Sequence, residues 1–156
     1  MSAIEQRLAD IGLQLPAVVP PVAAYVPAVL DGDLVWTSGQ LPVVDGRLLA
    51  TGKVGTGPDQ VSPERAAELA RQCALNALAA VKSVVGDLDR IARVVKVVGF
   101  VASDPSFTGQ PVVINGASLL LQQVLGDAGV HARSAVGVAT LPLDSPVEVE
   151  LVARLH

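Results

Sequence analysis

Residues 131–155 read HARSAVGVATLPLDSPVEVELVARL. This stretch holds two Val-rich segments, 134–141 and 147–155, whose composition is typical of β-strands. Between them, Asp144-Ser145-Pro146 has the composition of a turn. The stretch therefore predicts two strands that end the chain.

The last predicted strand has two chemically different faces. Its apolar residues alternate with Glu148 and Glu150, so the two sets of side chains lie on opposite sides of the strand. The apolar side is suited to packing against helices. We therefore expect both glutamates to point away from the helix layer, toward solvent or a partner subunit.

Two helices and one strand are predicted upstream of this stretch. Ser62-Pro63-Glu64 supplies an N-cap, a proline suited to the first turn and an acidic residue for the positive end of the helix dipole, which predicts a helix to about Val85. Residues 91–102 are Val-rich and predict a central strand. Residues 111–125 predict a largely buried second helix that ends at Gly126.

The N-terminal part adds a short helix and a hairpin. Residues 2–12 predict an amphipathic helix, and the prolines of residues 13–27 favour an extended arm. Asp31-Gly32-Asp33 predicts the turn of a hairpin, and residues 43–59 predict a loop or short strands. The fold class is therefore α/β (α+β): one domain, 1–156, with two helices on one face of a mixed sheet and an N-terminal helix and arm at 1–24.

Composition predicts an oligomer. Hydrophobic residues make up 51% of the chain and charged residues 17%, so a monomer would leave apolar surface exposed. No apolar run reaches the roughly 18 residues that a membrane-spanning helix needs. The N-terminus resembles no signal or transit peptide, and a single cysteine, Cys73, suits a reducing compartment, so we expect a cytoplasmic protein. A net charge of -4 without a basic tract speaks against a nucleic-acid partner.

Several segments together resemble one known family. They are AAYVPAV around Tyr25, LVWTSGQLPV (34–43), Ala74-Leu75-Asn76-Ala77-Leu78, VVKVVGFVAS (94–103) and HARSAVGVATLPLDSPVEVELVA (131–153). The chain from about Tyr25 onward resembles the YjgF-like Rid (reactive-intermediate deaminase) family, historically labelled endoribonucleases or translation-initiation inhibitors. The N-terminal helix and the Gly-rich loop resemble a longer subgroup of that family.

The resemblance implies a chorismate-mutase-like fold and a homotrimer. Three sheets would pack around a central barrel, with a cleft between each pair of neighbouring subunits. In the family's deaminases, an arginine binds the substrate carboxylate and a glutamate on the last strand positions a water. That water hydrolyses a 2-imino acid to a 2-keto acid and ammonia without a cofactor.

By position, the resemblance assigns the carboxylate-binding arginine to Arg133 and the glutamate to Glu148. It assigns the cleft glycine to Gly39 and the cleft tyrosine to Tyr25. Ala135 stands where the deaminases carry a cysteine. It keeps a backbone N–H for substrate binding but has no thiol.

Each assignment has a structural alternative. Arg133 can bind a carboxylate through two parallel hydrogen bonds, or pair with a glutamate across a subunit interface. Glu148 can orient a water or be a paired strand carboxylate. Tyr25 can wall the cleft or pack beside the Pro-rich arm, and Gly39 can admit a ligand or mark a bulge.

Other candidates are weaker. Phe107 and Asn115 can shape the rim of the cleft and contact substrate, although Asn115 and Ser118, three residues apart on one helix, equally suit a local or subunit contact. Cys73 lies on an apolar helix face and is interpreted as a core residue. His131 has no Cys or second His at ligand spacing, so no metal site is expected.

Two functions therefore remain open. The first is a cofactor-independent hydrolase that deaminates imino or enamine acids, with Arg133 as anchor and Glu148 orienting water. The second is a trimeric protein that binds a small carboxylate metabolite without converting it, which Ala135 favours. Endoribonuclease activity fits the acidic composition less well.

Overall fold

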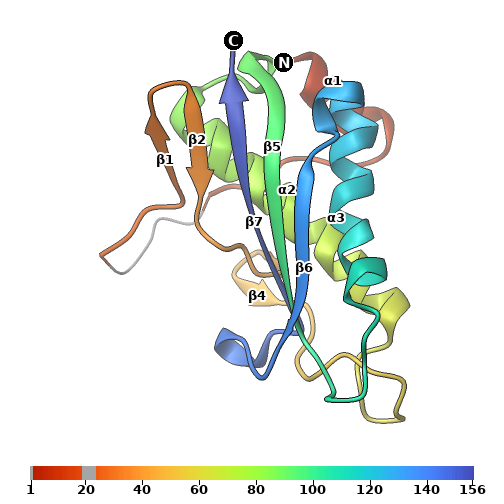
Figure 1. Ribbon diagram of the computed structural model, residues 1–156. Coiled ribbons are helices and arrows are strands. Elements are labelled where there is room, and N and C mark those ends of the chain that lie inside the picture. The colour runs from red at the N-terminus through yellow and green to blue at the C-terminus, as the bar shows by residue number, and fades with distance from the viewer. Residues whose placement is uncertain (1, 19–23) are drawn as a thin grey trace.

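One five-stranded sheet organises the chain. A computed structural model describes residues 2–18 and 24–156. The strand order is β1-β2-β7-β5-β6, and the long helices α2 and α3 both cover the same face of the sheet (Figure 1). This confirms the predicted mixed α+β architecture. The predicted arm includes residues 19–23, which lie outside the described residues.

Apart from the strand predicted at 134–141, the element bounds follow the predictions closely. The helices are α1 (Ala3–Asp10), α2 (Pro63–Val85) and α3 (Gln110–Leu125), and the short 3-10 helices are η1 (Leu88–Arg90), η2 (Gly126–Gly129) and η3 (Pro142–Asp144). The sheet strands are β1 (Ala28–Asp31), β2 (Leu34–Thr37), β5 (Ile91–Ala102), β6 (Ala132–Val138) and β7 (Val147–Leu155). A separate small hairpin joins β3 (Val43–Val44) and β4 (Arg47–Leu48).

A serine caps the start of both α1 and α2. Ser2 accepts from the amide of Glu5, and the Glu5 side chain accepts from the amide of Ser2, which completes a capping box at the start of α1. Ser62 accepts from the amide of Arg65 at the start of α2, with Pro63 in the first turn. These side chains satisfy amides that have no partner inside the helix, so the helices begin where the caps stand.

The predicted strand at 134–141 is wrong at both ends. β6 begins at Ala132 and ends at Val138. It begins earlier because it pairs in parallel with β5 from Ala132, opposite Lys96. It ends earlier because the chain turns into η3, where Leu143 adopts a positive φ of 58°.

The side of the sheet that the helices cover is called the helix face. Every β7 residue of the apolar set is buried on it, and the intervening residues are not, which confirms the alternation predicted for this strand. Helices α2 and α3 approach closely where Gly116 lies against the backbone carbonyl of Ala67. This approach needs a glycine, since a Cβ at position 116 would overlap the carbonyl oxygen. The fully buried residues of largest volume include Leu69, Leu78, Leu120, Leu121, Val94 and Val97.

The other side of the sheet is called the open face, and no helix of the described chain covers it (Figure 1). Strand registers and burial place on it Val29, Trp36, Lys96, Val98, Phe100, Ser134, Val136, Glu148, Glu150 and Val152. Trp36 is 50% exposed and Val29 is 51% exposed. Large apolar side chains therefore meet solvent beside two carboxylates.

Candidate functional site

Arg133 lies on β6, the edge strand next to α3. Its parallel partner is Val97, which is fully buried on the helix face, so the Arg133 side chain starts on that side of the sheet. Arg133 Nη1 donates to Asn115 Oδ1 at 2.8 Å and to Ser118 Oγ at 3.2 Å. Its Nη2 donates to the carbonyl oxygen of Pro111 at 3.3 Å. The first turns of α3 therefore fix the orientation of the guanidinium.

All three acceptors around Arg133 are neutral. They are an amide, a hydroxyl and a backbone carbonyl, and within residues 2–18 and 24–156 no carboxylate forms an ion pair with Arg133. The positive charge is therefore held in place without being neutralised by its own chain. A guanidinium in this condition can form charge-assisted hydrogen bonds to an incoming carboxylate.

The network continues from Ser118 to His131. His131 Nδ1 lies 2.6 Å from the carbonyl oxygen of Gly129, and a carbonyl can only accept, so Nδ1 carries the proton. In the neutral ring Nε2 is then an acceptor, and the Ser118 hydroxyl 2.9 Å away donates to it. Burial lowers the pKa of His131, the Gly129 carbonyl opposes this, and the charge of Arg133 adds to the lowering. Ser118 thus accepts from Arg133 and donates to His131.

Glu148 lies on the open face, opposite to Arg133. It lies opposite Phe100 of the neighbouring strand β5, and it is half-buried. Burial raises the pKa of the Glu148 carboxyl, and the neighbouring charge of Glu150 raises it further. A carboxylate with a raised pKa accepts a proton more readily than an exposed glutamate does.

Gly39 lies directly against Glu148. It follows β2 and precedes Gln40, whose backbone exchanges two hydrogen bonds with Val149 of β7, at 2.8 and 3.0 Å. A Cβ at Gly39 would overlap Glu148 Oε1. The absence of a Cβ at Gly39 therefore leaves room for the Glu148 carboxylate in this position.

Tyr25 belongs to the segment that leads into β1. Ser38 donates through its hydroxyl to the carbonyl of Val26 at 2.6 Å and through its amide to the carbonyl of Pro27 at 2.8 Å. These bonds bring the start of the segment beside Ser38 and Gly39. The Tyr25 side chain is 61% exposed, so its ring presents most of its surface to solvent.

Ala135 and Phe107 lie on the same side of the molecule as Arg133. Ala135 follows Arg133 by two residues, pairs with Gly99 of β5 and packs partly against the core. The Phe107 ring lies over Gly109, where an added Cβ would come within 2.8 Å of Phe107 Cζ. Phe107 therefore packs next to the start of α3, from which Asn115 contacts Arg133.

The predicted site residues thus form two groups in one chain. The α3 group, at the β6 edge, contains Arg133, Ala135, Phe107 and Asn115. The β7 group, at the β2–β7 junction, contains Glu148, Gly39 and, through its backbone, Tyr25. Strand β5 separates β6 from β7, and Arg133 and Glu148 start from opposite faces of the sheet. One chain therefore does not bring the anchor and the carboxylate into one cleft.

Ser118 and His131 were not predicted as members of the site. Two signals were present in the sequence. Ser118 stands three residues after Asn115 and so shares its helix face, and His131 stands two residues before Arg133 and so shares its side of the strand. Read together, these two spacings place both side chains beside the arginine.

Neither of two hollows on the surface is lined by Arg133 or Glu148. The larger, of about 650 Å³, lies between α1, residues 13–18 and α2. The smaller, of about 410 Å³, lies at one end of the sheet and includes Arg93, His131 and Arg154. Within the described ranges, no three His, Cys, Asp or Glu side chains gather as a metal site would require. No helix among the described residues is both long and apolar enough to cross a membrane.

Known proteins resemble this chain over almost its whole length. Protein TCP17 of Trypanosoma cruzi is 42% identical over 154 residues, covering 98% of this chain and 94% of its own. The crystal structure of Atu1372 from Agrobacterium tumefaciens, a protein of unknown function, is 44% identical with a TM-score of 0.89, covering 99% of this chain and 93% of its own. Escherichia coli TdcF, solved with bound serine, is 26% identical with a TM-score of 0.58, covering 91% of this chain and 94% of its own.

A family profile matches residues 5–155, under the description "YjgF/chorismate mutase-like, putative endoribonuclease". The match begins at Glu5, so it includes most of α1 as well as the segments from Tyr25 onward. The matched residues include the five-stranded sheet, with Arg133 on β6 and Glu148 on β7. The chain belongs to the YjgF/chorismate mutase-like family.

Proposed function

We propose that the protein binds a small carboxylate metabolite at Arg133, in a cleft that a second copy of the chain completes. Support comes first from the Arg133 guanidinium, which three neutral acceptors orient while no carboxylate of the described chain neutralises it. A planar guanidinium in a fixed orientation is suited to two parallel hydrogen bonds with a carboxylate. The bound serine of TdcF is a small carboxylate of this kind.

The separation of the two groups supports a cleft between subunits. Arg133 is on the edge strand β6. Tyr25 leads into β1, the edge strand at the other end of the sheet, and Gly39 follows the neighbouring strand β2. Packing the β1–β2 side of one copy against the β6 edge of the next would bring a Tyr25 close to an Arg133. A homotrimer with three such clefts agrees with the exposed apolar side chains of the open face.

The reaction that suits these residues is hydrolysis of a 2-imino acid. Water adds to the carbon of the C=N bond, and the resulting amino alcohol loses ammonia to leave a 2-keto acid. Glu148, whose pKa is raised by burial, is suited to taking the proton from the attacking water and returning it to the departing nitrogen. Arg133 would hold the carboxylate in both the imine and the product.

A second function is favoured by Ala135. A methyl group at this position cannot polarise a substrate or hold a water as a thiol can. Binding through Arg133 does not depend on that side chain, because the guanidinium contacts are made by α3. The protein would then hold a carboxylate metabolite without converting it.

Calorimetry with 2-ketobutyrate tests the binding site. We expect the wild type to bind and Arg133→Ala to lose at least about tenfold in affinity, because a charge-assisted pair contributes on the order of 1.5–3 kcal/mol. Arg47→Ala, at an exposed arginine of β4, is the matched control and should bind as the wild type does. Equal affinity of the wild type and Arg133→Ala would refute the site.

A coupled assay separates the enzyme from the binding protein. An amino-acid oxidase generates the imino acid in place, and the rate of 2-keto acid release is compared with and without this protein. Acceleration that Glu148→Gln abolishes supports the hydrolase. Binding of 2-ketobutyrate with no acceleration, for several imino acids, supports the non-catalytic function instead.

A further inference from the structure

Two arginines face each other at one end of the sheet. Arg93 of β5 and Arg154 of β7 are directly opposite across the strand pair, and both are exposed. They line the hollow of about 410 Å³ with Val94, Val95, Val130, His131 and Ala132, and no acidic residue is among these. Like charges directly opposite on neighbouring strands destabilise a sheet. This basic pocket therefore has an electrostatic cost that a negatively charged partner would remove.

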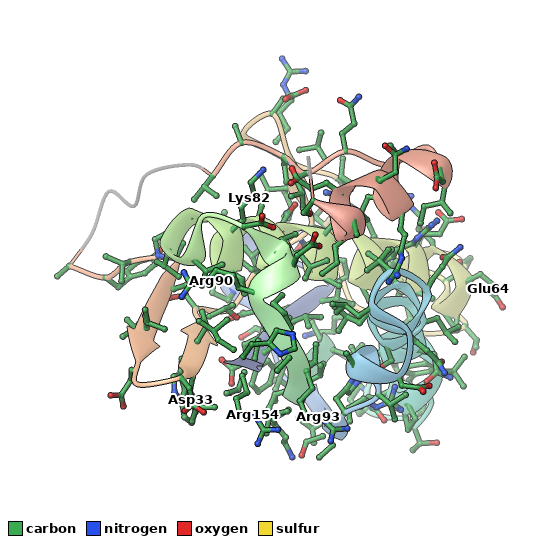
Figure 2. The ribbon with its side chains drawn as sticks, turned by 90° about the horizontal axis from the view of Figure 1, so that it is seen from above. Asp33, Glu64, Lys82, Arg90, Arg93 and Arg154 are labelled. Atoms are coloured by element: carbon green, nitrogen blue, oxygen red, sulfur yellow. The ribbon has the colours of Figure 1, made fainter. Side chains whose placement is uncertain are left out.

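The chain does not neutralise this pocket by itself. Arg93 Nη2 donates to the carbonyl oxygen of Val130 at 3.2 Å, and neither Arg93 nor Arg154 forms an ion pair in the part of the chain that the structure describes. Asp33 lies next to Arg154 in the view from above, in a row that continues to Arg93 (Figure 2). Its carboxylate is nonetheless not within ion-pair distance of Arg154.

An acidic turn stands at the other edge of the same sheet. Asp31-Gly32-Asp33 connects β1 to β2, and all three residues are exposed. The strand registers place Asp31 opposite Leu34, Leu34 opposite Arg154, and Arg154 opposite Arg93. Asp31 and Arg93 therefore stand at the same level, at the two ends of this row, and Arg154 lies between them.

We propose that the basic pocket of one copy binds the Asp31-Gly32-Asp33 turn of a second copy. This inference rests on the cleft between subunits of the proposed function. Rotation about an axis that runs along the strands keeps equal levels together, so the turn at the β1–β2 edge of one copy comes next to Arg93 of its neighbour. Each copy offers one turn and one pocket, so the contact is heterologous and can close into a ring.

The ion pairs and the apolar open face have different roles in this contact. Burial of the exposed Trp36 and Val29 supplies the favourable free energy, because it removes apolar surface from water. Apolar contacts are not directional, however, and would allow many orientations. The ion pairs between two carboxylates and two guanidiniums determine which end of one sheet meets which end of the next. Their attraction also speeds the association of the two copies.

Charge reversal tests the contact. The turn variant carries Asp31→Arg and Asp33→Arg, the pocket variant carries Arg93→Glu and Arg154→Glu, and the swapped variant carries all four changes. Sedimentation equilibrium at low salt compares their assembly with that of the wild type. We expect the turn and pocket variants to weaken assembly by at least about tenfold, because like charges then meet across the contact. The swapped variant should recover most of the loss.

Matched controls keep folding apart from assembly. Asp59→Lys with Glu64→Lys reverses two exposed carboxylates that lie outside the turn, and it should assemble as the wild type does. Far-UV circular dichroism and the thermal midpoint of each variant check the fold. The swapped variant carries every substitution of the other two. If it assembles, the loss of assembly in the turn and pocket variants is not caused by a folding defect.

Three results would contradict the proposed contact. Wild-type assembly of the turn and pocket variants, or no recovery in the swapped variant, would overturn the contact, as would a monomeric wild type of 16.0 kDa. Stabilisation by inorganic phosphate that requires Arg93 and Arg154, with assembly unchanged, would assign the pocket to a small anion instead. Binding of 2-ketobutyrate at Arg133 is measured separately. A protein that assembles as expected but does not bind it supports this contact and refutes the proposed function.

Discussion

The two faces of the sheet differ in how complete they are. On the helix face, β7 presents Val147, Val149, Leu151 and Ala153 to α2, and each is at most 2% exposed. On the open face, the same strand presents Glu148, Glu150 and Val152, which are only partly buried. One face is a finished core within a single chain. The other combines apolar side chains, two carboxylates and Lys96, and it has no covering layer in the described chain (Figure 1).

The residues that stabilise the fold and the residues proposed to act in function therefore lie in different places. Burial of the helix face supplies the free energy that keeps one chain folded. The proposed ligand and the second copy both act on groups outside that core, namely Arg133, Glu148 and the basic pocket. Substitutions in the two regions should therefore have different readouts, and three experiments test that division.

The largest effect is expected in α3, where two neighbouring leucines differ in burial. Leu120 is 1% exposed and Leu119 is 62% exposed. Leu120→Ala should lower the free energy of unfolding by about 3 kcal/mol, because it leaves a cavity in the core. Leu119→Ala should change it by less than about 0.5 kcal/mol. Urea denaturation of both variants measures the difference, and similar losses would contradict the assignment of the faces.

A smaller effect is expected when one methyl group is added on each side of the molecule. A Cβ at Gly116 would overlap the backbone carbonyl of Ala67, so Gly116→Ala should push α3 away from α2 and cost about 2 kcal/mol. A Cβ at Gly39 would instead overlap the Glu148 side chain, which can rotate.

Gly39→Ala should therefore cost less stability than Gly116→Ala, about 1 kcal/mol or below, while removing any imine hydrolysis by displacing Glu148. Thermal unfolding and the coupled assay together measure both consequences. The comparison fails if Gly39→Ala proves the more destabilising of the two, or if it leaves a measured hydrolysis rate untouched.

The smallest effect is expected from pH. The folded pKa of Glu148 is raised above its ordinary value of 4.5, mainly by burial. The penalty for ionising it is therefore absent below the unfolded pKa and develops as pH rises through the folded pKa. Glu148→Gln removes the penalty and should stabilise the fold at pH 7, by less than about 1 kcal/mol because the group is half exposed.

At pH 4 the advantage of Glu148→Gln over the wild type should disappear. Thermal midpoints at both pH values check this, with Glu64→Gln as the exposed control. A gain that is equal at pH 4 and pH 7 would show that the substitution acts through packing and not through charge.

Most of the fold could be predicted from local signals. Ser62 and Pro63 fixed the start of α2, and the alternation in 147–155 fixed both the strand and the direction of its glutamates. The ends of β6 could not be predicted, because they depend on pairing with β5, where Lys96 lies opposite Ala132. The local sequence pattern holds no sign of this distant contact. Local propensity finds elements, while tertiary pairing sets their ends.

The candidate site residues could be proposed from the sequence, but their arrangement in space could not be predicted. Arg133 Nη1 donates to Asn115 Oδ1, so these two candidate residues are in contact. The placement of Arg133 and Glu148 on opposite faces depends on the parallel register of β6, which no property of the HARS segment encodes. Whether the two groups meet is decided by how copies of the chain pack.

Trp36 gives this molecule a built-in optical reporter. It is the only tryptophan of the chain, it lies on the open face, and half of its surface meets water. Its emission should therefore shift to shorter wavelength when a second copy covers it, while circular dichroism at helix wavelengths follows α2 and α3. Dilution should move the fluorescence alone, and heating should move both. The same uncovered indole that makes the isolated chain incomplete allows its assembly to be followed without any label.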